Sequence, residues 1–302
     1  MKIIITGIQG FIGNNLANYC SLCGMQVTGI DFHKNIENET WKYYCCDLVK
    51  DNICNIILDV LPDAIVHCAG SADVKSSIEN PENDFQKNVI MTQNILYSLK
   101  SINYKCKFIF LSSAGVYGQP RKLPIDEDTK YSPMSPYALH KVIGEKMCMY
   151  FREIEGYDAI VLRIFSAFGP GLRKQVFWDM WNKIKNTGRL DLYGSGLESR
   201  DFIYIEDLVR IIYDIINFAE RSYDIINIAS GKEITINEIA KIFVEESGYN
   251  KDIIRFLGIK KEGDPDNWCA DISRVNSITK IQLTDIRSGI RKYIDWLNTL
   301  DS

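Results

Sequence analysis

The stretch "SPYALHK", Ser135 to Lys141, places a tyrosine and a lysine four residues apart. On a helix, Tyr137 and Lys141 project from the same side. A lysine ammonium beside a phenol lowers the pKa of the phenol, so the phenol can exchange a proton with a substrate hydroxyl. The same spacing also occurs on helices that carry no chemistry, so the pair gains meaning only from what other elements bring to it.

A serine pair at the end of an apolar strand supplies the next polar groups. The segment "FIFLSSAGVYG" ends its apolar run at Ser112 and Ser113 and continues with small residues. Ligands of doubly wound sheets bind at the carboxyl ends of strands, so both hydroxyls are expected to face a substrate. Ser113, Tyr137 and Lys141 together form a consistent catalytic set, in which the serine holds the substrate oxygen whose proton the tyrosine moves.

The N-terminal segment "IIITGIQGFIG" contains a glycine-rich turn. Gly7, Gly10 and Gly13 follow an apolar strand at three-residue intervals, and a helical pattern begins among them with Phe11 and Ile12. Such a turn lets the backbone approach a pyrophosphate, whose charge is met by amide groups at the helix N-terminus. The spacing is G-x-x-G-x-x-G, and its position in the first βαβ unit favours dinucleotide binding over an ordinary turn.

Asp31 ends the second expected strand, at the distance from Gly13 where an acidic residue binds an adenosine ribose. Its carboxylate would repel a 2′-phosphate, which favours NAD(H) over NADP(H). His33 and Lys34 follow closely and work against this discrimination. A turn residue at a strand end is the alternative interpretation.

The N-terminal half alternates short apolar runs with longer helical patterns, which predicts βαβ units around a parallel sheet. The expected strands are Lys2–Thr6, Gln26–Asp31, Ala64–Cys68, Lys107–Ser112 and Ala159–Phe165, and the expected helices lie near Ile12–Cys23, Asp84–Lys100 and Tyr137–Glu155. The predicted fold class is α/β, a Rossmann-type doubly wound parallel sheet with a smaller C-terminal α/β substrate lobe. The NAD-binding domain is expected in 1–165, rejoined by part of 201–228, and the second lobe mostly in 166–302.

Composition narrows the class of protein. The chain has 302 residues, 46% hydrophobic and 25% charged, which suits two lobes with a sizeable core. A net charge of -4 gives no broad basic surface, so nucleic acid and anionic membranes are not expected as partners. The first apolar run breaks at glycine too early for a signal peptide or membrane span, which predicts a cytoplasmic protein.

The nine cysteines are scattered and odd in number, as expected of reduced thiols. Cys20 and Cys23 form a C-x-x-C without a second such pair, so core packing is the favoured interpretation over a redox or zinc site. The three histidines do not cluster in sequence either. No metal is expected.

The order of these motifs resembles a known family. The chain is similar along most of its length to extended short-chain dehydrogenases/reductases of the nucleotide-sugar epimerase/dehydratase group. The similar motifs are "TGIQGFIG", "CDL" at Cys46–Leu48, "HCAG" at His67–Gly70, "NVIMT" at Asn88–Thr92, "LSSAGVYG", "SPYALHK", "GPG" at Gly169–Gly171, "RDFIYIEDL" at Arg200–Leu208, "NIASG" at Asn227–Gly231 and "GDPDNWCADISR" at Gly263–Arg274.

The resemblance implies roles for further residues. Asp47 and Leu48 would bind the adenine end of NAD, Ala69 and Gly70 would line its diphosphate, and Asn88 would be a further cofactor residue; Tyr137 and Lys141 would also hold the nicotinamide ribose. Arg200 would meet the diphosphate of a nucleotide sugar, a solvated arginine beside Asp201 being the alternative. A homodimer through the helices near Asp84–Lys100 and Tyr137–Glu155 is also implied.

The departures from the family pattern are as informative. Dehydratases of this group carry Asp-Glu where this chain has Ala114 and Gly115, so a 4,6-dehydratase is not expected. Ser166 replaces a common asparagine among the substrate residues, and Lys261 replaces an arginine as a point charge. Lys174 is a further candidate for the nucleotide, next to the aromatic stripe Phe177, Trp178 and Trp181, for which core packing is the alternative.

The expected function is NAD(H)-dependent oxidation or reduction at C4 of a nucleotide-diphosphate sugar. The first interpretation is a 4-dehydrogenase or 4-ketoreductase in bacterial surface-polysaccharide precursor synthesis. The alternative is a 4-epimerase, which uses the same hydride step with tightly bound NAD and returns the hydride to the other face of the sugar. A non-catalytic NAD-binding regulator on the same fold is the third possibility, disfavoured because Ser113, Tyr137 and Lys141 are all present.

Overall fold

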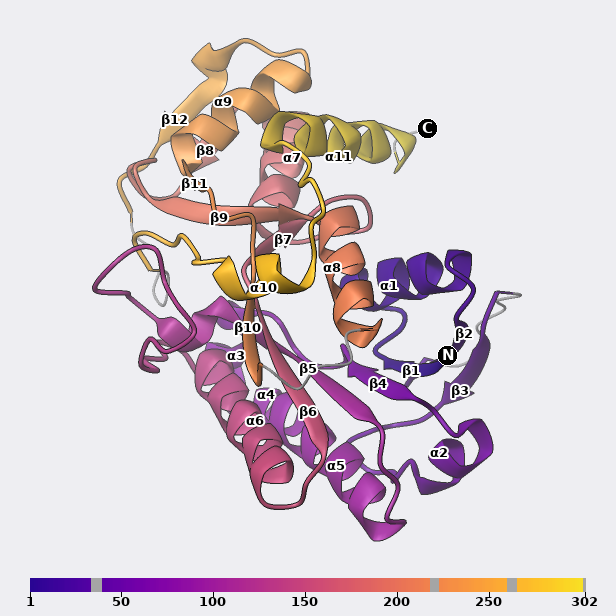
Figure 1. Cartoon of the computed structure of the whole chain (residues 1–302). Coiled ribbons are helices and arrows are strands. Elements are labelled where there is room, and N and C mark those ends of the chain that lie inside the picture. The colour runs from indigo at the N-terminus through magenta and orange to yellow at the C-terminus, as the bar shows by residue number, and fades with distance from the viewer. Residues whose placement is uncertain (34–39, 218–222, 260–264, 301–302) are drawn as a thin grey trace.

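The computed structural model describes residues 1–33, 40–217, 223–259 and 265–300. Its larger lobe is built on a seven-stranded sheet (Figure 1). From edge to edge the strands are β10 (Ile225–Ile228), β6 (Asp158–Ile164), β5 (Lys107–Ser113), β4 (Ala64–His67), β1 (Lys2–Thr6), β2 (Gln26–Asp31) and β3 (Lys42–Cys45). All neighbouring strands are parallel, which confirms the doubly wound Rossmann-type sheet.

The strand order changes direction between β1 and β4, and the carboxyl ends of these two strands border the crevice where such sheets bind dinucleotides. Alternate side chains of β1 enter two separate cores. Ile3 and Ile5 pack in one core with Leu16 and Leu208, whereas Ile4 packs in the other, among residues of the helices opposite. Helices therefore cover both faces of the sheet, as its continuous apolar strands require.

The first face carries α1 (Phe11–Leu22) and α8 (Ile205–Asn217), whose side chains Tyr19 and Tyr213 meet edge to face at 5.4 Å. The second face carries α2 (Cys54–Val60), α5 (Met91–Ser101) and α6 (Pro136–Glu153). α8 and β10 pack on the large sheet, although in sequence they lie between elements of the second lobe; the chain therefore returns to the first lobe once and then completes the second.

The expected helix Asp84–Lys100 has a more complex structure than its pattern suggested. The chain forms α3 (Val74–Glu79) and α4 (Pro81–Phe85), passes through a π-helical turn over Gln86–Ile90, and continues as α5. π-Turns are rare and concentrate at functional sites. This one contains Asn88, whose buried side chain lies beside Gly70, just after the end of β4.

The second lobe holds two small sheets. β7 (Ser166–Phe168) pairs in parallel with β9 (Ser199–Tyr204), which pairs antiparallel with β11 (Glu233–Thr235), and β8 (Leu190–Leu192) pairs with β12 (Ile254–Phe256). Its helices are α7 (Gln175–Thr187), α9 (Ile236–Glu246), α10 (Ser273–Ile278) and α11 (Ile286–Leu300). Short 3-10 helices cover Ala114–Tyr117 and Lys251–Ile253.

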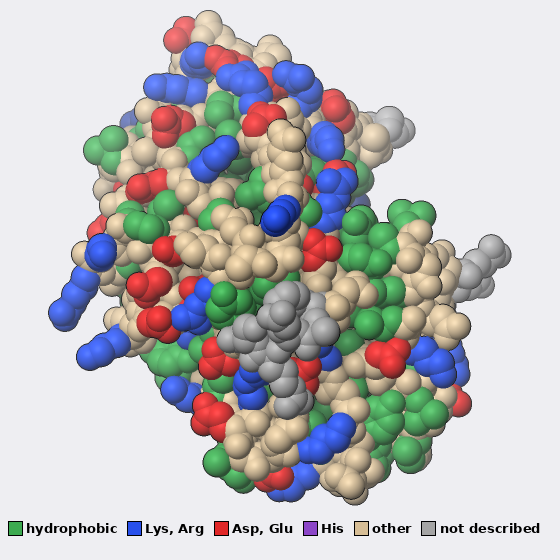
Figure 2. Space-filling model, viewed as in Figure 1, with side chains coloured by type: hydrophobic (Ala, Val, Ile, Leu, Met, Phe, Trp, Pro, Cys, Tyr) green, Lys and Arg blue, Asp and Glu red, His purple; other side chains and the backbone are tan. Residues whose placement is uncertain are grey.

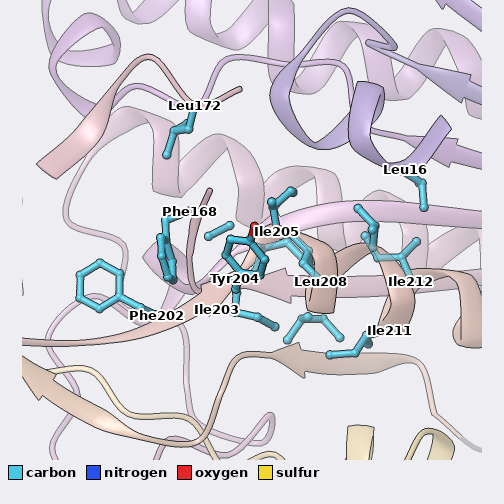
Figure 3. Packing of buried hydrophobic residues seen from close by; sticks show 14 of the residues in the cluster. Leu16, Phe168, Leu172, Phe202, Ile203, Tyr204, Ile205, Leu208, Ile211 and Ile212 are labelled. Carbon is cyan, nitrogen blue, oxygen red and sulfur yellow. The ribbon is translucent and has the colours of Figure 1, made fainter. Parts of the chain in front are cut away.

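One continuous apolar core joins the two lobes. Figure 3 shows Phe168 and Tyr204 of the second lobe beside Ile205 and Leu208 at the start of α8, with Leu16 of α1 farther along the same layer. Phe168 lies 4.9 Å, ring to ring, from Phe177. Phe177 and Trp181 are buried in this core, so two of the three aromatic residues of the α7 stripe serve packing, as the alternative held.

Basic and acidic side chains are interspersed over the face seen in Figure 2, in keeping with the small net charge. Among the helices that the structure describes, none combines the length and the apolar character that crossing a membrane requires.

Candidate functional site

Helix α6 holds the tyrosine and lysine at its N-terminal end. The Ser135 hydroxyl caps the helix by accepting a hydrogen bond from the Ala138 amide at 3.2 Å, and Pro136 occupies the first turn. Tyr137 and Lys141 are both buried. The Lys141 ammonium donates to the Leu111 carbonyl oxygen at 2.9 Å, which ties the helix to β5.

The Ser113 hydroxyl faces the same space as the Tyr137 ring. It accepts a hydrogen bond from the Gly115 amide at 3.1 Å. A β-carbon at Gly115 would lie 3.3 Å from Ser113 Oγ and 3.9 Å from Tyr137 Cε1, so this space is kept open by a glycine. The structure therefore brings Ser113, Tyr137 and Lys141 together at the end of β5.

Burial dominates the acid–base properties of this pair. It raises the pKa of Tyr137 to about 12, against the hydrogen bond with Ser113, which lowers it. Burial also lowers the pKa of Lys141 to about 8, and the charge of Asp84 is the largest effect that opposes this. Lys141 therefore titrates closer to neutral pH than an exposed lysine, and its ammonium lies 5.9 Å from the centre of the Tyr137 ring.

Ser112 points away from Ser113, as successive residues of a strand do. Its buried hydroxyl donates to the carboxylate of Glu145, which also receives Arg163 Nη2 at 2.8 Å and the Tyr131 hydroxyl at 2.8 Å. The structure thus places Ser112 in a buried polar network behind the catalytic set. Its expected contact with the substrate is not supported by this placement.

The glycine turn is packed so tightly that side chains would not fit. Gly7 has φ +67°, and a β-carbon on it would lie 2.6 Å from the backbone of Ala69. A β-carbon on Gly13 would lie 2.2 Å from the Gly7 carbonyl oxygen. Gly10 precedes α1 without a side-chain cap, so the first-turn amides after it, at Phe11 and Ile12, suit a diphosphate.

Asp31 is buried at the end of β2 beside this turn. Its carboxylate accepts hydrogen bonds from the Gln9 amide at 3.0 Å and the Phe32 amide at 2.9 Å, and His33 Nδ1 lies 3.1 Å away. A negative charge fixed against the glycine turn disfavours a 2′-phosphate. Lys34 lies outside the described residues.

Two further residues expected at the adenine end follow β3. The Asp47 carboxylate accepts from the Val49 amide at 3.1 Å and pairs with Lys50, whereas the Leu48 side chain is buried in the core. Any contact of Leu48 with a ligand would therefore come from its backbone.

Asn88 presents an unpaired acceptor to the crevice. Its side-chain nitrogen donates to the Asp84 carbonyl oxygen at 3.2 Å, but its buried Oδ1 has no hydrogen-bond partner among the described residues. Asn88 Oδ1 and Lys141 Nζ lie 2.9 and 3.6 Å from the position that a β-carbon on Gly70 would take. An open backbone with an unpaired acceptor and an ammonium beside it fits a hydroxyl-bearing cofactor such as NAD.

Arg200 lies in β9 of the second lobe. Its Nη1 donates to the Ser199 carbonyl oxygen at 2.8 Å, and its guanidinium lies 5.5 Å from the centre of the Trp268 ring. Asp201 faces elsewhere, because its buried carboxylate accepts from the amides of Ser230, Gly231 and Ala270. Arg200 is half-buried, and its role toward a diphosphate stays a prediction, as does the alternative of a solvated arginine.

The other substrate candidates are placed less centrally. Lys174 precedes α7, and its ammonium lies 3.4 Å from the Ala72 carbonyl oxygen at the crevice. Ser166 is partly buried in β7, opposite Phe202 of β9. Lys261 lies outside the described residues.

The sequence analysis did not single out three residues that the structure brings to this site. Asp84 and Glu145 both act on the charge of Lys141, and Trp268 donates from Nε1 to the Gly118 carbonyl oxygen at 2.9 Å. Glu145 had a signal: it follows Lys141 by one helical turn on an otherwise buried face. Asp84 had no such signal in the sequence, because its hydrogen-bond partner His140 lies 56 residues away in the chain.

The chain is similar over most of its length to enzymes that act on nucleotide sugars. The chain is 28% identical over 312 residues to the UDP-glucuronate 4-epimerase of Thermodesulfobacterium geofontis, covering 97% of this chain and 95% of the relative. It is 26% identical over 268 residues to the GDP-6-deoxy-D-mannose reductase of Pseudomonas aeruginosa, covering 84% and 83%. The structure of UDP-glucuronic acid 4-epimerase from Bacillus cereus, with UDP-glucuronic acid and NAD, superposes with a TM-score of 0.90 at 26% identity, covering 99% of this chain and 100% of that one.

The match to a family model covers both the glycine turn and helix α6. Residues 3–229 match the NAD dependent epimerase/dehydratase family. This span includes each of the cofactor residues named above. The chain belongs to the NAD dependent epimerase/dehydratase family, and its cofactor is NAD.

Proposed function

We propose that the protein is a 4-epimerase of a UDP-sugar. The observation that carries the proposal is the set of Ser113, Tyr137 and Lys141 at the end of β5, beside the unpaired acceptor of Asn88. Similarity to two 4-epimerases over nearly the full chain supports it. The similarity to the GDP-6-deoxy-D-mannose reductase covers a smaller share of the chain, 84%.

The chain's own residues supply the proton chemistry. Tyr137, as phenolate, takes the proton of the sugar C4 hydroxyl while Ser113 holds the same oxygen, and Lys141 favours the phenolate by its charge. NAD, when bound, accepts the C4 hydride and returns it. After the 4-keto sugar turns over in the pocket, Tyr137 gives the proton back to the C4 oxygen. The burial of Tyr137 and Lys141 keeps water from competing for that proton.

The sequence first suggested a net 4-dehydrogenase or 4-ketoreductase, with a 4-epimerase as the alternative. We now favour the 4-epimerase. The first expectation depended on Ser166, a single position in β7. The chain offers no acid–base pair beside Ser113 for eliminating water, since Ala114 is buried and Gly115 has no side chain. The expected role in surface-polysaccharide precursor synthesis and the cytoplasmic location rest on the sequence alone and stay predictions.

For the nucleotide, we propose that Arg200 and Lys174 meet the diphosphate. The Arg200 guanidinium lies 5.5 Å from the centre of the Trp268 ring, and its planar group can make a two-point contact with a phosphate. Lys174 adds a flexible point charge from the N-terminal end of α7.

The test is product analysis with UDP-glucose, UDP-glucuronic acid and UDP-N-acetylglucosamine, each incubated separately with the purified protein. Epimerisation predicts that proton NMR shows the galacto isomer at equilibrium with the starting sugar, at unchanged mass. A product that differs by two hydrogens, or by one water, would replace the proposal with net redox or dehydratase chemistry.

We further propose a homodimer through α5 and α6. Four apolar side chains on these helices are exposed: Tyr97 at 53%, Leu139 at 47%, Tyr150 at 47% and Ile154 at 69%. Tyr97 and Tyr150 both contact Phe151, at 5.6 and 5.9 Å between rings, so they form one patch. Light scattering of the wild-type protein is expected to give twice the chain mass. The double variant Tyr97→Glu, Ile154→Glu is expected to have the mass of a single chain. A wild-type monomer would contradict the proposal.

A further inference from the structure

A buried acidic residue and a histidine form a pair next to the catalytic residues. Asp84 of α4 and His140 of α6 are 2% and 7% exposed, and His140 Nδ1 lies 2.6 Å from Asp84 Oδ2. A carboxylate only accepts, so Nδ1 carries the hydrogen and donates it. The Phe85 ring closes over the imidazole edge to face at 5.3 Å. The pair is therefore fixed in one geometry and shielded from water.

The second carboxylate oxygen of Asp84 is left without a partner. Asp84 Oδ1 is buried and has no hydrogen bond among the described residues, like the nearby Asn88 Oδ1. Leaving a buried carboxylate oxygen unpaired is costly, and such groups are kept where their charge has a use. Asn88 places this carboxylate near Lys141, the residue next to His140 in α6: Asn88 Nδ2 donates to the Asp84 carbonyl oxygen at 3.2 Å, and Asn88 Oδ1 and Lys141 Nζ lie 2.9 and 3.6 Å from the β-carbon position of Gly70. In agreement with this placement, the charge of Asp84 raises the pKa of Lys141.

We propose that Asp84, held in place by His140, is a positioning residue that acts as the buried counter-charge of the Lys141 ammonium. This inference rests on the proposed role of Tyr137 and Lys141. Burial lowers the pKa of Lys141, and a fixed negative charge in a medium of low dielectric opposes that shift. The hydrogen bond from His140 fixes the orientation of the Asp84 carboxylate, so its charge faces α6, the helix that carries Lys141.

Other groups face Lys141 as well, and Asp84 has the strongest effect on it among the charged groups. In decreasing order after Asp84, those that raise the pKa of Lys141 are the Cys68 thiol after β4, Glu145 of α6 and the Cys148 thiol of α6. Glu145 is already paired with Arg163, and His67 at the end of β4 is kept neutral by burial, which lowers its pKa to about 3. Asp84 also raises the pKa of Tyr137.

The direction of the effect follows from these signs. Replacing Asp84 by asparagine removes a negative charge near both groups, so the pKa of Lys141 and the pKa of Tyr137 both fall. The two limbs of the kcat/KM profile report the coupled titration of Tyr137 and Lys141 as a pair. Both limbs are therefore expected to move to lower pH in Asp84→Asn.

The experiment uses the full chain saturated with NAD and labelled with ¹³C-lysine. The Lys141 ¹³Cε resonance is assigned by its loss in Lys141→Met and titrated by NMR in wild type, Asp84→Asn and Glu82→Gln. Glu82 is the matched control, because it is an acidic residue of the same short helix whose side chain is exposed. The expected result is a fall of about one unit in the Lys141 midpoint in Asp84→Asn and no change in Glu82→Gln.

The outcomes separate this inference from the proposed function. A folded Asp84→Asn protein with an unmoved Lys141 midpoint and unmoved pH limbs would overturn the counter-charge while leaving the epimerase intact. A lowered midpoint in a protein that epimerises no UDP-sugar would keep the counter-charge and remove the proposed function. Should Asp84→Asn fail to fold, the double variant Asp84→Asn, His140→Gln supplies a neutral amide pair and is read in the same way.

Discussion

Arg163 of β6 donates two hydrogen bonds to the carboxylate of Glu145 of α6, from Nη2 to Oε2 at 2.8 Å and from Nε to Oε1 at 3.1 Å. Both side chains are almost wholly buried, at 1% and 0% exposed. The same guanidinium donates from Nη1 to the Tyr117 hydroxyl at 2.8 Å, and Tyr117 donates to Asn227 of β10 at 2.6 Å. The pair thus connects the catalytic helix with two strands of the large sheet.

Glu145→Gln is expected to destabilise the protein by about 3–5 kcal/mol, because Arg163 would keep its charge in the core without a counter-charge. Urea denaturation measures this. Glu79→Gln serves as the control, since its pair with Lys75 is exposed on both sides and contributes at most about 1 kcal/mol. Equal effects of the two changes would contradict a structural role for the buried pair.

Tyr137→Phe is expected to lower kcat about 100- to 10,000-fold, because the ring stays in place and only the proton-carrying hydroxyl is removed. The thermal melting curve should match that of wild type. Tyr97→Phe, on the exposed face of α5, should leave kcat unchanged. Full activity in Tyr137→Phe would show that another group moves the C4 proton and would contradict the proposed role of Tyr137.

The stability of the chain is expected to depend on pH through Lys141. Burial lowers its pKa from 10.5 to about 8, so between these values the unfolded chain holds a proton that the folded chain has released. The free energy of unfolding therefore rises with pH in this window, by about 3 kcal/mol over its width, and the penalty for charging Lys141 is present in full below it.

Chemical denaturation of wild type and Lys141→Met at several pH values checks this. The stability of wild type relative to Lys141→Met should increase across the window. Lys75→Met, at an exposed lysine, should run parallel to wild type. Parallel curves for Lys141→Met as well would show that the folded chain does not depress the pKa of Lys141.

Asp31→Ala is expected to weaken NADH binding about 10- to 100-fold, since a charged hydrogen-bond partner of the ribose is lost. Binding of NADPH should weaken less or improve, because the fixed negative charge near the 2′ position is gone. Fluorescence titration with both dinucleotides measures the ratio of the two affinities. An unchanged ratio would contradict the role of Asp31 in cofactor choice.

Local patterns predicted the parts of the fold that depend on neighbours in sequence. The structure forms β1 and β2 with the expected bounds, Lys2–Thr6 and Gln26–Asp31, because continuous β-branched and apolar runs flanked by turns leave few alternatives. β3 escaped prediction, since its residues Lys42–Cys45 are half-exposed and carry no apolar alternation. The π-turn before α5 has no signature in the helical pattern either.

In the candidate site too, some residues could be predicted from the sequence and others could not. Ser113, Tyr137 and Lys141 were found because their types and order suggest chemistry. The orientation of Ser112 toward Glu145, and the pairing of Asp84 with His140, depend on the packing of α6 against β5 and α4. Such contacts join residues far apart in sequence, and a single sequence holds no measure of which side chains meet.

The most direct test of the central claim follows a deuterium label placed at C4 of UDP-glucose. An epimerase that returns the hydride it removed predicts UDP-galactose with the deuterium still at C4, and no NADH accumulating in solution. Loss of the label from the sugar into free NADH, with a product two hydrogens poorer than the substrate, would show that the enzyme releases the 4-keto sugar and would contradict the account.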